Sequence, residues 1–189
     1  MNQLNNSYNR KEVSALWLIY SSYLILTFNH ENILKFTGSD GKKFRGDIFK
    51  DVDHMNETMI DNWNRLVKPE DKIYHLGDVY FGNQQKAELI LSRLNGKKRL
   101  IVGNHDTIYG KGNVLQKHFQ KIYMWRLFKE FNMCLTHVPI HESSFRKVEY
   151  NVHGHIHEKK SPTEKHICVC VEHTNYTPVN IEEVIKKYG

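Results

Sequence analysis

The chain has 189 residues and a formal net charge of +6. This length supports one hydrophobic core, so we predict a single domain. The charge favours anionic partners, but the basic residues form short scattered clusters without interleaved aromatic residues, so no specific nucleic-acid motif is present. Three cysteines without a zinc-type spacing argue against a disulfide framework and favour a reducing, cytoplasmic location.

Residues 1–27 form an atypical lead-in to the predicted domain, which covers residues 28–189. Residues 13–28 are largely apolar and follow two basic residues, a pattern that superficially resembles a signal peptide or a short anchor. The stretch is too short for a comfortable membrane span and contains three serines. We therefore interpret it as leading into a buried first strand, and expect no membrane association.

The first part of the predicted domain alternates helices and strands. Met55, Met59 and Trp63 recur at helical spacing and predict an amphipathic helix over residues 50–66. Strands are predicted at residues 72–79 and 99–102, with a helix over residues 84–94 between them.

The second part of the chain is richer in strands. Short strands are predicted over residues 131–135, 150–152 and 166–171, and a final helix begins after Asn180 as its N-cap and runs to residue 187. Alternating elements followed by a strand-rich half predict an α/β fold of the α+β sandwich type, with two packed mixed β-sheets flanked by helices.

Polar clusters directly follow four of the predicted strands. Strand ends present functional side chains because the strand fixes the backbone while the following loop frees the side chain. Carboxylate, amide and imidazole groups together suit manganese, iron, nickel or zinc. The clusters are Gly77-Asp78, Gly103-Asn104-His105-Asp106, Thr136-His137 and His153-Gly154-His155-Ile156-His157.

The order of these clusters resembles the calcineurin-like metallophosphoesterases, and most of all their small single-domain members from bacteria and phages. The resemblance implies hydrolysis of a phosphomonoester or phosphodiester by metal-activated water, with two divalent metal ions as cofactors. It implies that Asp78 bridges the two ions, that Asn104, His137 and His155 complete one site, and that His157 belongs to the other. Residues 28–33, 55–57, 63–64 and 175–176 are also similar to these proteins.

The resemblance further implies catalytic roles for two residues of the second cluster. His105 would protonate the leaving oxygen or stabilise the transition state. Asp106 would fix the tautomer and orientation of His105, a pairing consistent with general acid chemistry.

The first motif of this family, an Asp-x-His at the end of the first strand, is missing. Ile25 and Thr27 stand in its place, which leaves only Asp78 and His157 for the first metal. His30 is the nearest substitute ligand. A reading-frame slip is another explanation, since codons for residues 23–25 can encode Ser-Asp in a different frame.

Three functions therefore remain open at the level of sequence. The first is a metal-dependent phosphoesterase. The second is a degenerate family member that binds one metal or phosphate with weak or no activity. The third is a basic nucleic-acid-binding protein that uses the fold as a platform.

Overall fold

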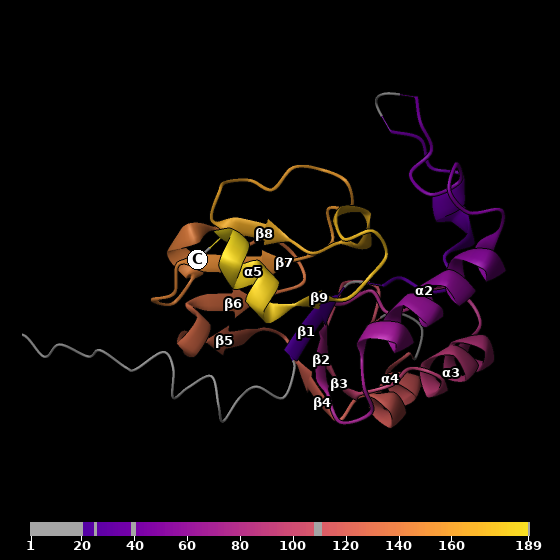
Figure 1. Cartoon of the computed structure of the whole chain (residues 1–189), viewed down its shortest axis with the longest axis horizontal. Coiled ribbons are helices and arrows are strands. Elements are labelled where there is room, and N and C mark those ends of the chain that lie inside the picture. Colours follow the sequence, from indigo (N-terminus) through magenta and orange to yellow (C-terminus); the bar gives the residue numbers. More distant parts are fainter. Residues whose placement is uncertain (1–20, 25, 39–40, 108–110, 189) are drawn as a thin grey trace, which may run out of the picture.

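The computed structural model describes residues 21–24, 26–38, 41–107 and 111–188. Within these residues the strands form two mixed sheets (Figure 1). The first sheet has the order β4-β3-β2-β1-β9, with β9 antiparallel to β1 and the other pairs parallel. Its strands are β1 (Ser21–Leu24), β2 (Lys72–His75), β3 (Lys97–Ile101), β4 (Lys121–Tyr123) and β9 (Val179–Asn180).

The second sheet has the order β5-β6-β7-β8, with only the β5–β6 pair antiparallel. Its strands are β5 (Arg126–Phe128), β6 (Met133–Leu135), β7 (Tyr150–His153) and β8 (His166–Cys168). The α-helices are α2 (Val52–Leu66), α3 (Gln84–Ser92), α4 (Gly112–His118) and α5 (Ile181–Tyr188). Short 3-10 helices are η1 (Glu31–Leu34), η2 (Lys129–Phe131), η3 (Glu142–Ser144) and η4 (Val171–His173).

Alternation along β2 and β3 explains why the layers stack as they do. Ile73 and Leu100 point to one face, where they share a core with α2, α3 and α4. Tyr74 and Ile101 point to the other face and pack against the second sheet and α5. Figure 1 shows this order, with the first sheet between the three helices and the second sheet. The predicted sandwich of two mixed sheets flanked by helices is confirmed.

Side-chain caps set the starts of three predicted helices. The Asp51 carboxylate accepts the N–H of His54 at 2.8 Å and starts α2 two residues after the predicted boundary. Asn83 caps α3 through the N–H of Lys86 at 3.0 Å. Asn180 accepts the N–H of residue 182 at 2.8 Å, so its predicted capping role is confirmed.

Other local predictions differ from the structure or concern residues that the structure does not describe. The strand expected at residues 166–171 ends at residue 168, because η4 begins at residue 171. The strands β4 and β5 and the helix α4 were not predicted. Of the expected lead-in at residues 1–27, residues 1–20 and 25 lie outside the described residues. Residues 21–24 form β1, which lies between β2 and β9. No helix among the described residues is long and apolar enough to cross a membrane.

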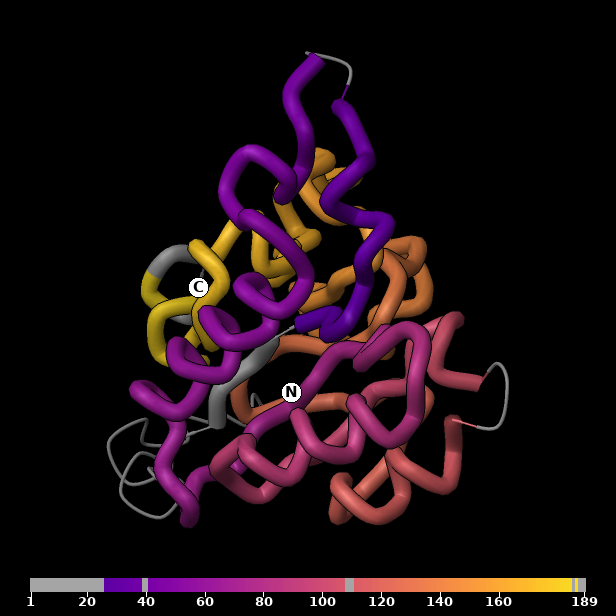
Figure 2. Tube along the Cα trace, turned by 90° about the vertical axis from the view of Figure 1, so that its right-hand side faces the viewer, coloured from indigo at the N-terminus to yellow at the C-terminus, as the bar shows by residue number. Residues whose placement is uncertain are grey.

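Residues 26–38 and 41–51, between β1 and α2, form a segment that extends toward the top of Figure 2, beyond the sheets. Its base is joined to the domain by a short bridge between Phe28 and Tyr80. Arg45, farther along the segment, is buried and forms an ion pair of 2.7 Å with Glu172 in η4. These contacts fix the segment beside the strand ends where the polar clusters lie.

Candidate metal centre

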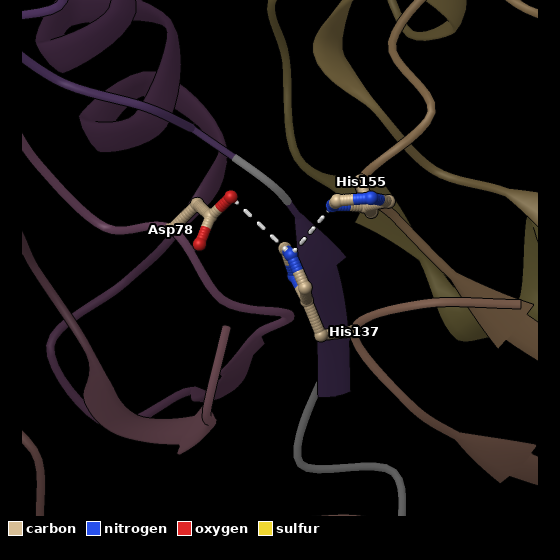
Figure 3. A group of neighbouring side chains, drawn as sticks. All are labelled: Asp78, His137 and His155. Atoms are coloured by element: carbon tan, nitrogen blue, oxygen red, sulfur yellow. Dashed lines mark hydrogen bonds and ion pairs between the residues drawn. The ribbon is translucent and has the colours of Figure 1, made fainter. Parts of the chain in front are cut away.

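The polar clusters meet because both sheets direct their carboxyl ends to the same place. Asp78 follows β2 and Asn104 follows β3 in the first sheet, whereas His137 follows β6 and His155 follows β7 in the second. The side chain of His137 is at the middle of this group, between Asp78 and His155 (Figure 3). The structure therefore brings together four of the five predicted metal ligands.

Three ligand atoms surround the Nε2 atom of His137. Asn104 Oδ1 lies 3.0 Å from it, His155 Nδ1 lies 3.2 Å from it, and Asp78 Oδ2 lies 3.3 Å from it. Adjacent ligands that each lie about 2.1 Å from a metal ion are about 3 Å apart. The donor set thus has the composition and the spacing that a divalent cation of the predicted kind requires.

The other ring nitrogen of His137 fixes the role of Nε2. Nδ1 lies 2.6 Å from the backbone carbonyl oxygen of Leu76, which can only accept a hydrogen bond. Nδ1 is therefore a donor, and Nε2 faces the neighbouring Asp78 and Asn104 oxygens, either with its lone pair in the neutral ring or with a proton in the charged ring. Such a carbonyl contact is typical of metal-bound histidines. Acceptor atoms that surround one nitrogen repel one another unless a positive charge lies between them. That charge is either a proton or a metal ion.

Electrostatics within the cluster follow from the contact between Asp78 and His137. Their side chains are only 13% and 5% exposed, respectively. Burial alone would raise the pKa of Asp78 and lower that of His137, but the contact between them outweighs burial in both cases. The pKa of Asp78 is thus lowered and that of His137 raised, which favours a charged pair. His155 is exposed as a whole residue, but partial burial of its side chain and then the neighbouring His137 lower its pKa.

Two glycines let the loops after β2 and β3 approach this closely. Gly77 has φ of +91°, and a β carbon there would collide with the ring of His137. A β carbon at Gly103 would collide with the carboxylate and backbone nitrogen of Asp78. Both glycines of the predicted motifs are therefore required by the geometry of the centre.

Backbone strain also concentrates here. Asp78, His155 and His157 have φ values of 55°, 67° and 53°, a left-handed conformation that residues other than glycine rarely adopt. Such conformations persist only where surrounding contacts enforce them, and they cluster at functional sites. In this protein they turn the Asp78 and His155 side chains toward His137.

Asp106 does not have the predicted role of orienting His105. One carboxylate oxygen accepts the N–H groups of Asp78 and Gly103 at 2.9 and 2.8 Å, and the other accepts the N–H of Val79 at 2.8 Å. The Asp106 carboxylate is buried and makes these three hydrogen bonds. Among the described residues, no hydrogen bond joins this carboxylate to the His105 ring. The prediction is corrected: Asp106 ties the β2 loop to the β3 loop.

His105 nevertheless lies beside the cluster. Its backbone N–H donates to Asp78 Oδ1 at 2.9 Å, so it is attached to the same carboxylate that faces His137. Its ring packs on Phe81, with centroids 4.8 Å apart, and the ring of His30 covers Phe81 at 4.1 Å. His105 is half-buried and lies next to the candidate ligand Asp78.

His157, the fifth predicted ligand, is not part of the group around His137. Its Nδ1 lies 3.2 Å from Oε1 of Glu172, and that same oxygen accepts Arg45 Nη2 at 2.7 Å. Burial would raise the pKa of Glu172, but the contacts from His157 and Arg45 lower it to about 2. Thr27, which stands at a position where the resemblance to the metallophosphoesterases predicts a ligand, is buried and offers no imidazole.

His30 does not replace the missing ligands through Nδ1, because that atom accepts the N–H of Ile33 at 3.2 Å. Burial and the nearby charge of Arg45 lower the pKa of His30 to about 4. Sequence reasoning missed Arg45 and Glu172 altogether. Glu172 lies just before the similar stretch at residues 175–176, which was the available signal, whereas nothing in the sequence distinguished Arg45 from other basic residues.

Comparisons with known proteins place this chain in a family. No model of a known protein family matches the sequence. The uncharacterized protein MJ1445 of Methanocaldococcus jannaschii is 31% identical over 168 residues, which cover 84% of this chain and 85% of that protein. The chain belongs to the same family as MJ1445.

A solved structure extends the comparison to the fold. The protein of unknown function AQ665 from Aquifex aeolicus superposes with a TM-score of 0.66 at 23% sequence identity, over 89% of this chain and 98% of that one. At this identity the similarity concerns the fold alone. The chemistry of the centre therefore depends on its own residues.

Proposed function

We propose that this protein is a metal-dependent phosphoesterase that hydrolyses a phosphomonoester or a phosphodiester. The observation that carries the proposal is the convergence of Asp78, Asn104 and His155 on Nε2 of His137. Oxygen and imidazole ligands of this kind suit manganese, iron, nickel or zinc. A bound divalent cation supplies a Lewis acid for the phosphoryl oxygens and lowers the pKa of a coordinated water.

Each residue of the centre has a separate role in the proposed reaction. Asp78, Asn104, His137 and His155 would hold the cation, and the Leu76 carbonyl fixes the His137 ring by accepting the proton of Nδ1. The His105 ring, which is attached through its backbone to Asp78, donates a proton to the leaving oxygen of the ester. Asp106 supports this arrangement by joining the two loops that carry these groups.

Hydrolysis of bis(4-nitrophenyl) phosphate after reconstitution with manganese tests the proposal. We expect turnover by the wild type and a loss of about 100-fold or more in kcat for His105→Ala, the usual size of a general-acid contribution. His54→Ala, which removes an exposed imidazole on α2, is the matched control and should retain full activity. Absence of turnover of both this diester and the monoester 4-nitrophenyl phosphate by metal-loaded protein would overturn the proposal.

A second candidate function is supported by the surroundings of His157. The Arg45–Glu172 ion pair engages this histidine, and Thr27 replaces a ligand, so the place of the first metal lacks a full ligand set. Under this alternative the protein binds one cation and a phosphate group without efficient hydrolysis. One bound ion per chain combined with phosphate binding and no turnover would favour it.

A further inference from the structure

A cavity of about 720 Å³ opens beside the candidate metal centre. Asn104 and His137 form part of its wall, so the cavity and the cluster share two side chains. Its volume is within the range of pockets that bind small organic molecules. A phosphate ester held at the cluster would therefore have its organic group next to this cavity.

Part of the cavity wall is aromatic and apolar. Met124, Trp125 and Val138 line it, and they are 72%, 44% and 40% exposed, although side chains of this kind are usually buried. All three therefore offer accessible apolar surface beside the cavity. Exposed apolar groups that gather around a concave site mark a binding surface.

Arg146 gives this wall a specific geometry. Its guanidinium carbon lies 5.5 Å from the centre of the Trp125 ring, a cation–π contact that covers one face of the indole. Arg146 also lines the cavity, and among the described residues no carboxylate forms an ion pair with it. The hydroxyl residues Ser143 and Ser144 add hydrogen-bonding groups beside it.

We infer that this cavity binds the organic group of the substrate, and that this group is planar and aromatic, as in a nucleotide or an aryl phosphate. Trp125 stacks against the ring, Arg146 and the two serines contact its polar edge, and the phosphate is at the cluster around His137. The inference rests on the proposed function, because it names the class of phosphate ester that the centre takes.

Calorimetric titration of the manganese-loaded protein with three probes tests this inference. Adenosine 5′-monophosphate and phenyl phosphate carry an aromatic ring, whereas ribose 5-phosphate does not. Base stacking on an aromatic side chain corresponds to roughly a ten-fold gain in affinity, so we expect an aromatic probe to bind about that much more tightly than ribose 5-phosphate. A preference for adenosine monophosphate over phenyl phosphate indicates a nucleotide, and the reverse an aryl ester.

Substitutions of Trp125 in the cavity wall distinguish a loss of ring stacking from a loss of folding. Trp125→Ala should abolish the preference for the aromatic probe, whereas Trp125→Phe should restore most of it. Leu89→Ala, which removes an apolar side chain that is 68% exposed on α3, is the control and should leave the preference unchanged. Equal binding of the aromatic and sugar probes by the wild type, or a preference that survives in Trp125→Ala, would overturn the inference.

The two proposals fail in different ways. If bis(4-nitrophenyl) phosphate is hydrolysed but binding shows no aromatic preference, the proposed function stands and the pocket inference is wrong. If the aromatic preference depends on Trp125 but no ester is hydrolysed, the pocket inference stands and the proposed activity is wrong.

Discussion

Gly103 packs so closely against Asp78 that a side chain at position 103 would have no room for its β carbon. The position that such an atom would take at Gly103 collides with the Asp78 carboxylate and lies 3.0 Å from its Cγ. The loop after β3 thus forms one wall for the carboxylate that faces His137. The position of this candidate ligand depends on a residue that binds nothing itself.

We predict that Gly103→Ala displaces the Asp78 carboxylate and weakens manganese binding by at least about ten-fold, the usual size of the effect when a metal ligand loses its support. Gly112→Ala is the matched control, because a β carbon at Gly112 meets no atom within 4 Å. Titration with manganese measures both variants. Equal affinities would show that the contact between Gly103 and Asp78 does not position the ligand.

Asp106→Asn tests the corrected role of Asp106. The amide retains one acceptor but turns a donor toward backbone N–H groups, so we expect the free energy of unfolding to fall by about 2 to 4 kcal/mol. Asp61→Asn, at an exposed position on α2, should change it by less than about 0.5 kcal/mol. Urea denaturation measures the difference. A variant as stable as the wild type would contradict the structural role.

The buried ring of His75 predicts a loss of stability in acid. Its Nε2 lies 2.7 Å from the Leu26 carbonyl oxygen, and burial lowers its pKa to about 4 from the ordinary 6.5. The unfolded chain therefore takes up a proton first as the pH falls below 6.5, and stability decreases until the folded pKa is reached. Between pH 7 and pH 4.5 this amounts to about 2 kcal/mol.

Comparing His75→Gln with the wild type isolates this contribution, since other buried histidines titrate in both proteins. Urea unfolding at pH 7 and at pH 4.5 should show a smaller decrease in stability for the variant. The same decrease in both proteins would mean that His75 does not resist protonation.

Introducing the Asp-x-His motif of the metallophosphoesterases should add a metal ion if the proposed function is right. We predict that Ile25→Asp combined with Thr27→His raises the manganese content from one to two ions per chain, because Asp78 and His157 alone provide too few ligands. The pair Ile25→Asn and Thr27→Phe controls for size and polarity. Metal analysis after dialysis measures the content, and a count that stays at one in the restored variant would contradict the prediction.

The sequence predicted the layers and most of the centre for a clear physical reason. Each ligand-bearing cluster follows a buried strand, and parallel strands deliver their carboxyl ends to one edge, so Asp78, Asn104 and His137 meet. The elements β4 and β5 were missed because they are short and partly exposed, which leaves no regular hydrophobic pattern.

Other features depend on where side chains point, which residue types do not reveal. The motif predicted that Asp106 serves His105, whereas its carboxylate turns to three backbone N–H groups. The pair of Arg45 and Glu172 joins residues 127 positions apart, so no local pattern could indicate it. The aromatic wall of the cavity is likewise formed by separate elements that only folding brings together.

The metal content of His155→Ala tests the central claim most directly. His155 is exposed, so its removal should leave the fold intact while the cluster loses one ligand. We predict that manganese-reconstituted wild type and the His54→Ala control each retain one ion per chain after dialysis, and that His155→Ala retains none. Equal metal content in all three proteins would contradict the assignment of a metal centre around His137.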